Sequence, residues 1–362
     1  MNITEFVSIL DGIASFSLQE SYDNSGVQFA DLGADIKKVL ISLDLTSDIV
    51  DEAMQKKANV VLSHHPIMFS TVKNITKQKN PALFKAIVNN INLIAMHTNF
   101  DLAEDGLNDY VGKLLGIKKI TSIRRSTEKT YKFAVYVPIG YADKVRDALF
   151  DAGAGKIGNY GETSFNLQGN GTFTPLDGTH PFIGKKGRRE KVKEIKIETV
   201  IFERNINNVL LAMKRVHPYE EPAYDIYEIK GNPPSGIGMV GEVKEQRLKD
   251  FAKFVKAKLN AKHVRLIGAK DVSVKSVALC TGAGTSLVDE VQDLSVDIFI
   301  TGDIAHHVAL SAREMDLNLL DVEHFDTEKF FVDAIYERLV DNGIPKKVLL
   351  KSKKMQSPYT VL

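Results

Sequence analysis

Residues 60–66 read VVLSHHP, with two adjacent histidines at the end of an apolar run. The first three residues predict a short buried strand, because a brief apolar run bounded by breakers is typical of a strand inside a parallel sheet. The proline ends the strand, since it lacks the amide hydrogen that a ladder needs. His64 and His65 therefore lie at a strand's carboxyl end, where open α/β sheets bind ligands. They are either metal ligands or two ordinary polar residues leaving a strand.

The sequence around this strand predicts a parallel sheet. Strands are expected at 38–45 and 93–96, and helices at 48–58 and 81–90, which gives the order βαβαβ. This alternation indicates the α/β fold class, with parallel strands whose carboxyl ends meet at one edge. We therefore expect the polar residues after the three strands to converge there: Asp44, then His64 and His65, and then His97 and Asp101.

The last third of the chain returns to the same alternation. Its last strand is expected at 317–322, followed by one long helix at 327–342. His324 leaves that strand and Glu328 lies four residues later, so the two side chains share a helix face and can hold one cation. Glu323, just before this pair, is expected to face solvent.

Imidazole and carboxylate side chains make up the candidate metal ligands: His64, His65, Asp101, His324 and Glu328. This set suits Zn, Mn, Fe, Co or Ni. Five ligands exceed the four that a tetrahedral zinc needs, and a bridging carboxylate would favour two ions about 3.5–4 Å apart. We expect the two adjacent histidines to serve different ions and Glu328 to bridge them.

The middle of the chain follows another pattern. A β-α-β-β-α-β order is expected there, which is typical of a ferredoxin-like α+β domain. Its strands are expected at 131–137, 163–167, 193–202 and 223–229, and its helices at 142–152 and 206–216. A breaker-rich linker follows at 231–236. We therefore expect three segments, 1–124, 125–230 and 231–362, of which the second is an insertion into a domain formed by the other two.

Composition narrows the class of protein. Of the 362 residues, 44% are hydrophobic and 26% are charged, which is typical of a globular protein. No apolar run is long enough to span a bilayer, and the net charge of +1 gives no footprint for nucleic acid. Cys280 is the single cysteine, which excludes an intramolecular disulfide and a thiolate-cage metal site. We expect a cytoplasmic protein.

Several short motifs occur in order in the two outer segments: 23–26 (DNSG), 64–66 (HHP), 97–101 (HTNFD), 236–238 (GIG), 301–303 (TGD) with His307, and 324–328 (HFDTE). Together they resemble the NIF-three-like family of dinuclear-metal proteins, whose members are often named GTP cyclohydrolase 1 type 2 homologues. The resemblance implies the same five ligands for two divalent ions. It also implies a NIF-three-like α/β domain interrupted by a PII-like or CutA-like module.

The resemblance leads to two hypotheses of function. The first is a metal-dependent hydrolase that acts on a nucleotide-like or phosphorylated small molecule through a metal-activated water. The second is a non-catalytic metal-binding or regulatory protein that uses its inserted module for sensing or assembly. Under both hypotheses the resemblance implies a homo-oligomer, a hexameric ring.

Two histidines outside the ligand set are the candidate catalytic residues. His97 could bind metal, orient a ligand or move a proton, and we favour orientation or substrate contact because the resemblance leaves it outside the ligands. His307 matches a family histidine and could also move protons. Asp44 and Asp303 either position a ligand or cap a helix, and the loop 281–284 could cradle a phosphate.

Overall fold

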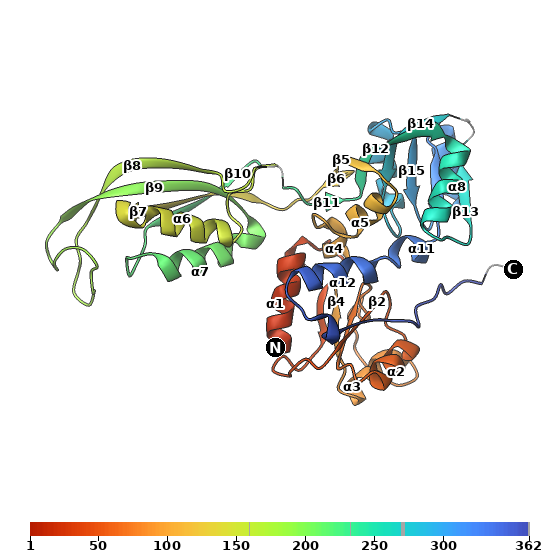
Figure 1. The fold of residues 1–362 in the computed structure, drawn as a ribbon, viewed down its shortest axis with the longest axis horizontal. Coiled ribbons are helices and arrows are strands. Elements are labelled where there is room, and N and C mark those ends of the chain that lie inside the picture. The colour runs from red at the N-terminus through yellow and green to blue at the C-terminus, as the bar shows by residue number, and fades with distance from the viewer. Residues whose placement is uncertain (159, 232, 269–271, 361–362) are drawn as a thin grey trace. The chain divides into compact units, whose positions relative to one another are not determined.

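The computed structural model describes residues 1–158, 160–231, 233–268 and 272–360, so Asn232 of the expected linker lies outside the described residues. Two compact units make up the chain (Figure 1). The outer unit comprises Met1–Ser126 and Ser235–Leu362, and the inserted unit comprises Thr127–Pro234. The segment boundaries expected from the sequence were 124/125 and 230/231.

A five-stranded sheet in the order β1-β4-β3-β2-β17 forms one part of the outer unit. Its strands are β1 (Gly26–Phe29), β2 (Val39–Ser42), β3 (Val60–Ser63), β4 (Asn92–Ala95) and β17 (Leu349–Lys351). All except β1 are paired in parallel, and β1 pairs antiparallel with β4. The βαβαβ prediction is confirmed for β2, β3 and β4, whose carboxyl ends lie side by side.

Both faces of this sheet are buried, which explains why its strands read as continuous apolar runs. Successive residues of β3 face opposite sides, so Val61 belongs to one hydrophobic cluster and Leu62 to the other. Four helices complete these clusters: α2 (Ser47–Gln55) and α3 (Pro81–Val88) on the Val61 face, and α1 (Ile3–Ile13) and α12 (Phe331–Asp341) on the Leu62 face.

A six-stranded sheet in the order β13-β16-β15-β14-β12-β5 forms the other part of the outer unit. Its strands are β5 (Lys118–Thr121), β12 (Met239–Arg247), β13 (Val264–Ile267), β14 (Ser273–Leu279), β15 (Ile298–Thr301) and β16 (Leu319–Val322). Only β14, β15 and β16 are parallel to one another. The antiparallel strand β12 and the helix after it, α8 (Leu248–Lys258), were not expected from the sequence.

The helix expected at 327–342 is confirmed as α12, but it starts at Phe331, because a separate short helix, α11 (His324–Glu328), occupies the preceding residues. The Thr327 hydroxyl donates to the His324 carbonyl and accepts from the Gly282 amide. Because these side-chain bonds fix the short helix α11, the chain starts a separate helix after it. The other short elements of this unit are α4 (Thr98–Leu102), α5 (Leu107–Leu114), β6 (Arg124–Arg125), β11 (Gly236–Ile237), α9 (Val288–Asp293) and α10 (His306–Glu314).

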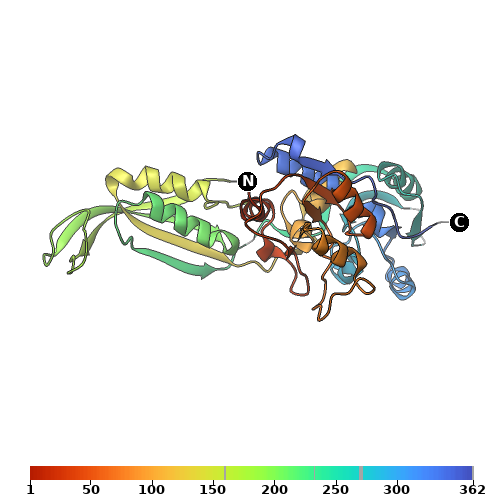
Figure 2. The ribbon, with the colours of Figure 1, turned by 90° about the horizontal axis from the view of Figure 1, so that it is seen from below.

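The inserted unit has the element order that the sequence predicted, with a sheet in the order β10-β7-β9-β8. Its elements are β7 (Thr130–Pro138), α6 (Ala142–Asp151), β8 (Ser164–Phe173), β9 (Glu190–Phe202), α7 (Ile206–Val216) and β10 (Tyr224–Ile229). Both helices pack on one face of the sheet, and the β8–β9 hairpin extends beyond them (Figures 1 and 2). In the described part of the chain, no helix is long and apolar enough to cross a membrane.

Candidate metal centre

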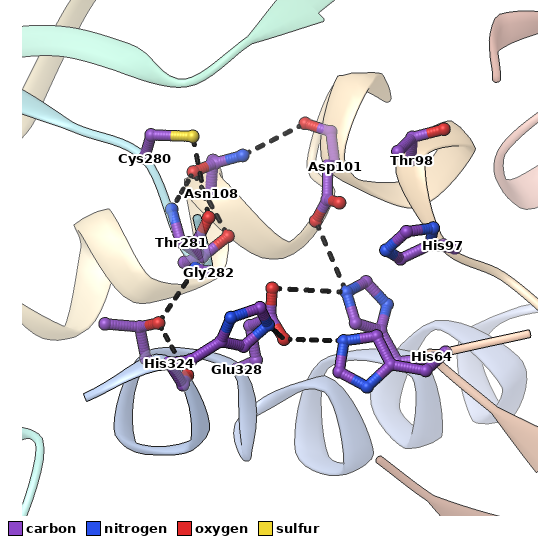
Figure 3. Close-up of polar contacts among 12 residues, drawn as sticks. His64, His97, Thr98, Asp101, Asn108, Cys280, Thr281, Gly282, His324 and Glu328 are labelled. Atoms are coloured by element: carbon purple, nitrogen blue, oxygen red, sulfur yellow. Dashed lines mark hydrogen bonds and ion pairs between the residues drawn. The ribbon is translucent and has the colours of Figure 1, made fainter. Parts of the chain in front are cut away.

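The candidate metal centre lies where loops at the carboxyl ends of strands from both sheets of the outer unit meet (Figure 3). His64 and His65 directly follow β3. His97 is the residue before α4, and Asp101 lies within that helix. His324 and Glu328 begin and end α11, which follows β16. The structure therefore brings together all five ligands predicted from the sequence, and places His97 beside them.

Four histidines of the centre each use Nδ1 for a hydrogen bond to an oxygen. Nδ1 of His64 lies 2.8 Å from Met96 O, that of His65 2.7 Å from Asp44 Oδ1, that of His97 2.8 Å from Asp23 Oδ1, and that of His324 2.8 Å from Asp303 Oδ2. Because carbonyls and carboxylates only accept, each Nδ1 donates, and in the neutral ring Nε2 keeps a free lone pair. This is the arrangement typical of metal-binding histidines.

The two oxygens of the Glu328 carboxylate face different Nε2 atoms. Its Oε1 is 3.8 Å from His64 Nε2, which is in turn 3.7 Å from Asp101 Oδ1. Its Oε2 is 3.0 Å from His65 Nε2 and 2.7 Å from His324 Nε2. We call His64, Asp101 and Oε1 the closed half, and His65, His324 and Oε2 the open half, because the closed-half side chains are 0–12% exposed and the open-half histidines 25–29%.

Unsatisfied polar atoms in the centre fit a metal. His64 Nε2, Asp101 Oδ1, His324 Nε2 and Glu328 Oε2 are buried and have no hydrogen-bond partner among the described residues. The last two lie 2.7 Å apart without the alignment of a hydrogen bond. Buried polar atoms are rarely left unpaired, because each costs about 1–3 kcal/mol. In the part of the chain that the structure describes, two groups of side chains could hold a metal ion: His65, His324 and Glu328, and His64, His65 and His97.

The two halves differ in their affinity for protons. Burial lowers the pKa of His64 to about 4, despite the nearby Glu328 carboxylate. Burial also opposes protonation of His65, but the nearby carboxylates of Asp44 and Glu328 outweigh it and raise the pKa to about 10. His324 follows the same pattern, with a pKa raised to about 9. Burial alone would raise the pKa of Glu328, but contacts with the three imidazoles hold it well below its usual range.

The loop after β14 makes room for the Glu328 carboxylate. Gly282 has a φ of +65°, and a Cβ at this position would collide with Glu328 Oε1. The loop's amides are already engaged, because those of Thr281, Gly282 and Gly284 donate to Asn108, Thr327 and Thr301. These contacts argue against a phosphate cradle at 281–284, which the sequence had left open as a possibility. Gly282 is needed for a different reason, namely to leave room for the Glu328 carboxylate.

Asp23 is a residue of the centre to which the sequence assigned no role. It is fully buried, and besides His97 it accepts hydrogen bonds from the amide and hydroxyl of Thr98 at 3.0 and 2.5 Å and from the Ser25 hydroxyl at 2.8 Å. Burial alone would raise the pKa of Asp23, but the bonds from His97 and Thr98 outweigh it and hold the pKa far below its usual range. Asp23 therefore presents a fixed carboxylate to His97, as Asp44 does to His65.

The side chains of two further residues considered from the sequence, His307 and Glu323, make no hydrogen bond or ion pair with the candidate metal ligands. His307 is exposed at the start of α10, and it makes no hydrogen bond, ion pair or ring contact with any described residue of the centre. Glu323 does not simply face solvent as expected, because it accepts a hydrogen bond from the Ser357 hydroxyl. Together with Asp303 it lines a cavity of about 330 Å³ beside the open half.

The fold and the site define an α/β protein with a candidate metal centre of histidines and carboxylates between two sheets. The family model described as Duf34/NIF3 (NGG1p interacting factor 3) matches residues 1–357, and the chain belongs to this family. It is 38% identical to proteins named GTP cyclohydrolase 1 type 2 homolog from Bacillus subtilis, over 94% of this chain and 93% of that protein, and from Halalkalibacterium halodurans, over 93% and 90%. The crystal structure of a Bacillus cereus protein related to NIF3 superposes with a TM-score of 0.89 at 34% identity, covering 100% of this chain and 99% of that one.

Proposed function

We propose that the outer unit binds two divalent metal ions, one in each half of the centre, with Glu328 as the bridge. The observation that carries this proposal is that one oxygen of the buried Glu328 carboxylate faces Nε2 of His64 and the other faces Nε2 of His65 and His324. A single ion would not need both groups. Zn, Mn, Fe, Co and Ni all suit these ligands.

We further propose that the centre is hydrolytic and that the open half is where substrate enters. Divalent ions held there would lower the pKa of water and stabilise negative charge on an oxyanion. His97, 14% exposed and held by Asp23 at Nδ1, directs Nε2 toward the His64 and His65 rings, whose centroids lie 5.1 and 5.4 Å away. At that position it can take a proton from the attacking group or give one to the leaving group. His307 would reach the centre only through a substrate or a partner chain.

Because the relatives are named GTP cyclohydrolase 1 type 2 homolog, we propose GTP or a similar nucleotide as the substrate. The test is to load the protein with Zn, Mn or Fe, incubate it with GTP, and follow nucleotide loss by chromatography. Turnover above that of a His65→Ala variant is expected. If wild type and variant are equally inactive with every metal, GTP is not the substrate. The metal content of the same samples tests the metal proposal separately.

The second candidate function is a metal-binding regulatory assembly in which the inserted unit, proposed to be PII-like or CutA-like, senses a small molecule. It is favoured by the cavity of about 520 Å³ within that unit, well apart in sequence from the metal ligands. Both functions are proposed to operate in a homo-oligomer, a hexameric ring. Mass measurement in solution tests the assembly, and a monomer at micromolar concentration would contradict it.

A further inference from the structure

The cavity of the inserted unit, about 520 Å³ in volume, is built around a buried carboxylate. Glu194 on β9 is only 7% exposed, and Oε1 accepts a hydrogen bond of 2.8 Å from the Tyr219 hydroxyl. Its second oxygen, Oε2, accepts no hydrogen bond from any described residue, and Glu194 forms no ion pair with one. The Glu194 carboxylate therefore offers the cavity a negatively charged oxygen that is free to accept a hydrogen bond from a cation.

Two features of the sequence hold this carboxylate in place. Gly171 lies on β8, next to β9. A Cβ at this position would collide with the Glu194 carboxylate, so the glycine leaves room for that carboxylate. His217 donates from Nε2 to the Tyr136 carbonyl at 3.1 Å and accepts the Tyr219 amide at Nδ1 at 3.0 Å. His217 therefore helps to position Tyr219, whose hydroxyl donates to Glu194. Burial and the adjacent Glu194 raise the pKa of Tyr219, so its hydroxyl stays a donor.

Aromatic rings form the wall of the cavity next to the carboxylate. The Tyr219 ring lies 5.8 Å from that of Phe173 and 6.4 Å from that of Phe182, between centroids. Aromatic faces attract organic cations, by about 0.5–2 kcal/mol per ring. An apolar wall of this kind also accommodates methylene groups, as ligand cavities of this size usually do.

Among the described residues, the charged side chains that line the cavity are all acidic. Glu220 and Glu221 lie exposed at its rim, whereas none of the described residues that line it is a lysine, arginine or histidine. The basic loop at 184–189 follows the lining residue Ile183 in sequence but does not itself line the cavity. Phosphate-bearing ligands would therefore meet carboxylates in the lining, and Lys196, whose Nζ lies 5.8 Å from the ring centroid of the lining residue Tyr136, is already paired with Glu198. Cations fit this cavity better than anions.

We propose that this cavity binds an aliphatic diamine or polyamine. One ammonium group donates to Glu194 Oε2, the methylene chain lies over Phe173, Phe182 and Tyr219, and a second ammonium group reaches the rim carboxylates of Glu220 and Glu221. This proposal does not depend on the hydrolytic function of the outer unit. It assigns to the inserted unit a ligand opposite in charge to a nucleotide.

Titration calorimetry of the full-length protein with 1,4-diaminobutane tests the proposal. Saturable binding with one site per chain is expected, tighter than binding of 1-aminobutane, and no binding of inorganic triphosphate at the cavity. Glu194→Gln should weaken diamine binding at least about tenfold, because a hydrogen bond to a charged group contributes about 1.5–3 kcal/mol. Phe182→Leu, at a half-exposed position that the fold can spare, should weaken it about threefold.

Two control variants locate the binding. Glu228→Gln removes an exposed carboxylate from β10 of the same unit, and His65→Ala removes a ligand from the metal centre. Neither should change diamine affinity, and thermal melting shows whether each variant is folded. The proposal is overturned if the diamine gives no saturable heat, if Glu194→Gln and Phe182→Leu both bind it like the wild type, or if His65→Ala abolishes binding.

Discussion

The closed and open halves of the candidate metal centre share one carboxylate but differ in burial and in the groups that anchor their histidines. In the closed half, His64 is fully buried and anchored to a main-chain carbonyl, that of Met96. In the open half, His65 and His324 are anchored by Asp44 and Asp303, whose side chains are 48% and 50% exposed. A closed set of ligands suits a permanently held ion, whereas an open one leaves room for substrate. The comparison teaches that the two halves differ more in burial than in ligand type, and we propose that this difference separates their roles.

Replacing the shared carboxylate should have the largest effect, because Glu328 is the one side chain that faces both groups. Glu328→Gln keeps the shape of the side chain but removes its charge. We expect it to lose both ions, with affinities reduced by more than about a hundredfold, beyond the 10–100-fold typical of outer-shell changes. Metal analysis after gel filtration measures the loss.

Glu323→Gln is the matched control for that change, since this carboxylate lies on the same segment and bonds to Ser357 instead of a ligand histidine. It should keep both ions. If Glu328→Gln also kept both, the division into two halves around a bridging carboxylate would be wrong.

The glycine next to the carboxylate gives a second, slightly smaller effect. Gly282→Ala adds a Cβ against Glu328 Oε1, so we expect the closed half to lose its ion and the open half to be weakened. Gly343→Ala is the matched control, because its φ is also positive, at +84°, but nothing lies within 4 Å of its added Cβ. Both variants should lose about 1–2 kcal/mol of unfolding free energy from backbone strain. Equal metal content in the two would contradict the steric argument.

The halves should also respond differently to pH. The pKa values of His65 and His324 are raised to about 10 and 9 in the metal-free protein, so a cation must displace protons from both. Their affinity for metal therefore rises with pH, by about tenfold per unit for each proton released. In the closed half, His64 is already neutral, and only Asp101, whose pKa is raised by burial and by the charge of Glu328, has a proton to lose.

Metal titrations between pH 6 and pH 8 measure this difference. The open-half ion should gain affinity about ten-thousandfold over this range, because two protons are released, and the closed-half ion should gain no more than about a hundredfold. Equal pH dependence of the two binding steps would show that the open-half histidines are not protonated as the geometry indicates.

The smallest effect is expected from the carboxylates that anchor the open half. Asp44→Asn should weaken the open-half ion about tenfold and leave the closed-half ion unchanged, because an amide anchors the imidazole less well. Asp48→Asn, an exposed change in the following helix, is the control. Competition with a chelator measures both variants, and an equal loss of both ions in Asp44→Asn would show that the halves are not independent.

The sequence predicted those parts of the fold and site that depend on local pattern. Runs such as 60–63 predicted the parallel strands, and helix α7 was expected at its observed bounds, 206–216. The five candidate ligands were found because each follows a strand end, where polar residues after an apolar run are easily recognised. A local pattern was therefore sufficient to predict those strands and helices that bury a continuous apolar surface.

Contacts between distant residues could not be predicted in this way. Asp23 reaches His97 from 74 positions away, and no local signal marks it beyond the 23–26 motif. The role of Gly282 depends on the position of Glu328, which lies in another segment. The strand β12 was missed because its second half is exposed and rich in charged residues, which is not typical of a strand. The break before α12 was missed because it depends on the hydrogen bonds of Thr327.

Anomalous diffraction from crystals of the Mn- or Zn-loaded protein tests the two-half centre most directly. The account predicts two peaks about 3.5–4 Å apart. One should contact His64 Nε2 and Asp101, the other His65 Nε2 and His324, with Glu328 between them. A single peak contacted by both His64 and His65 would contradict it.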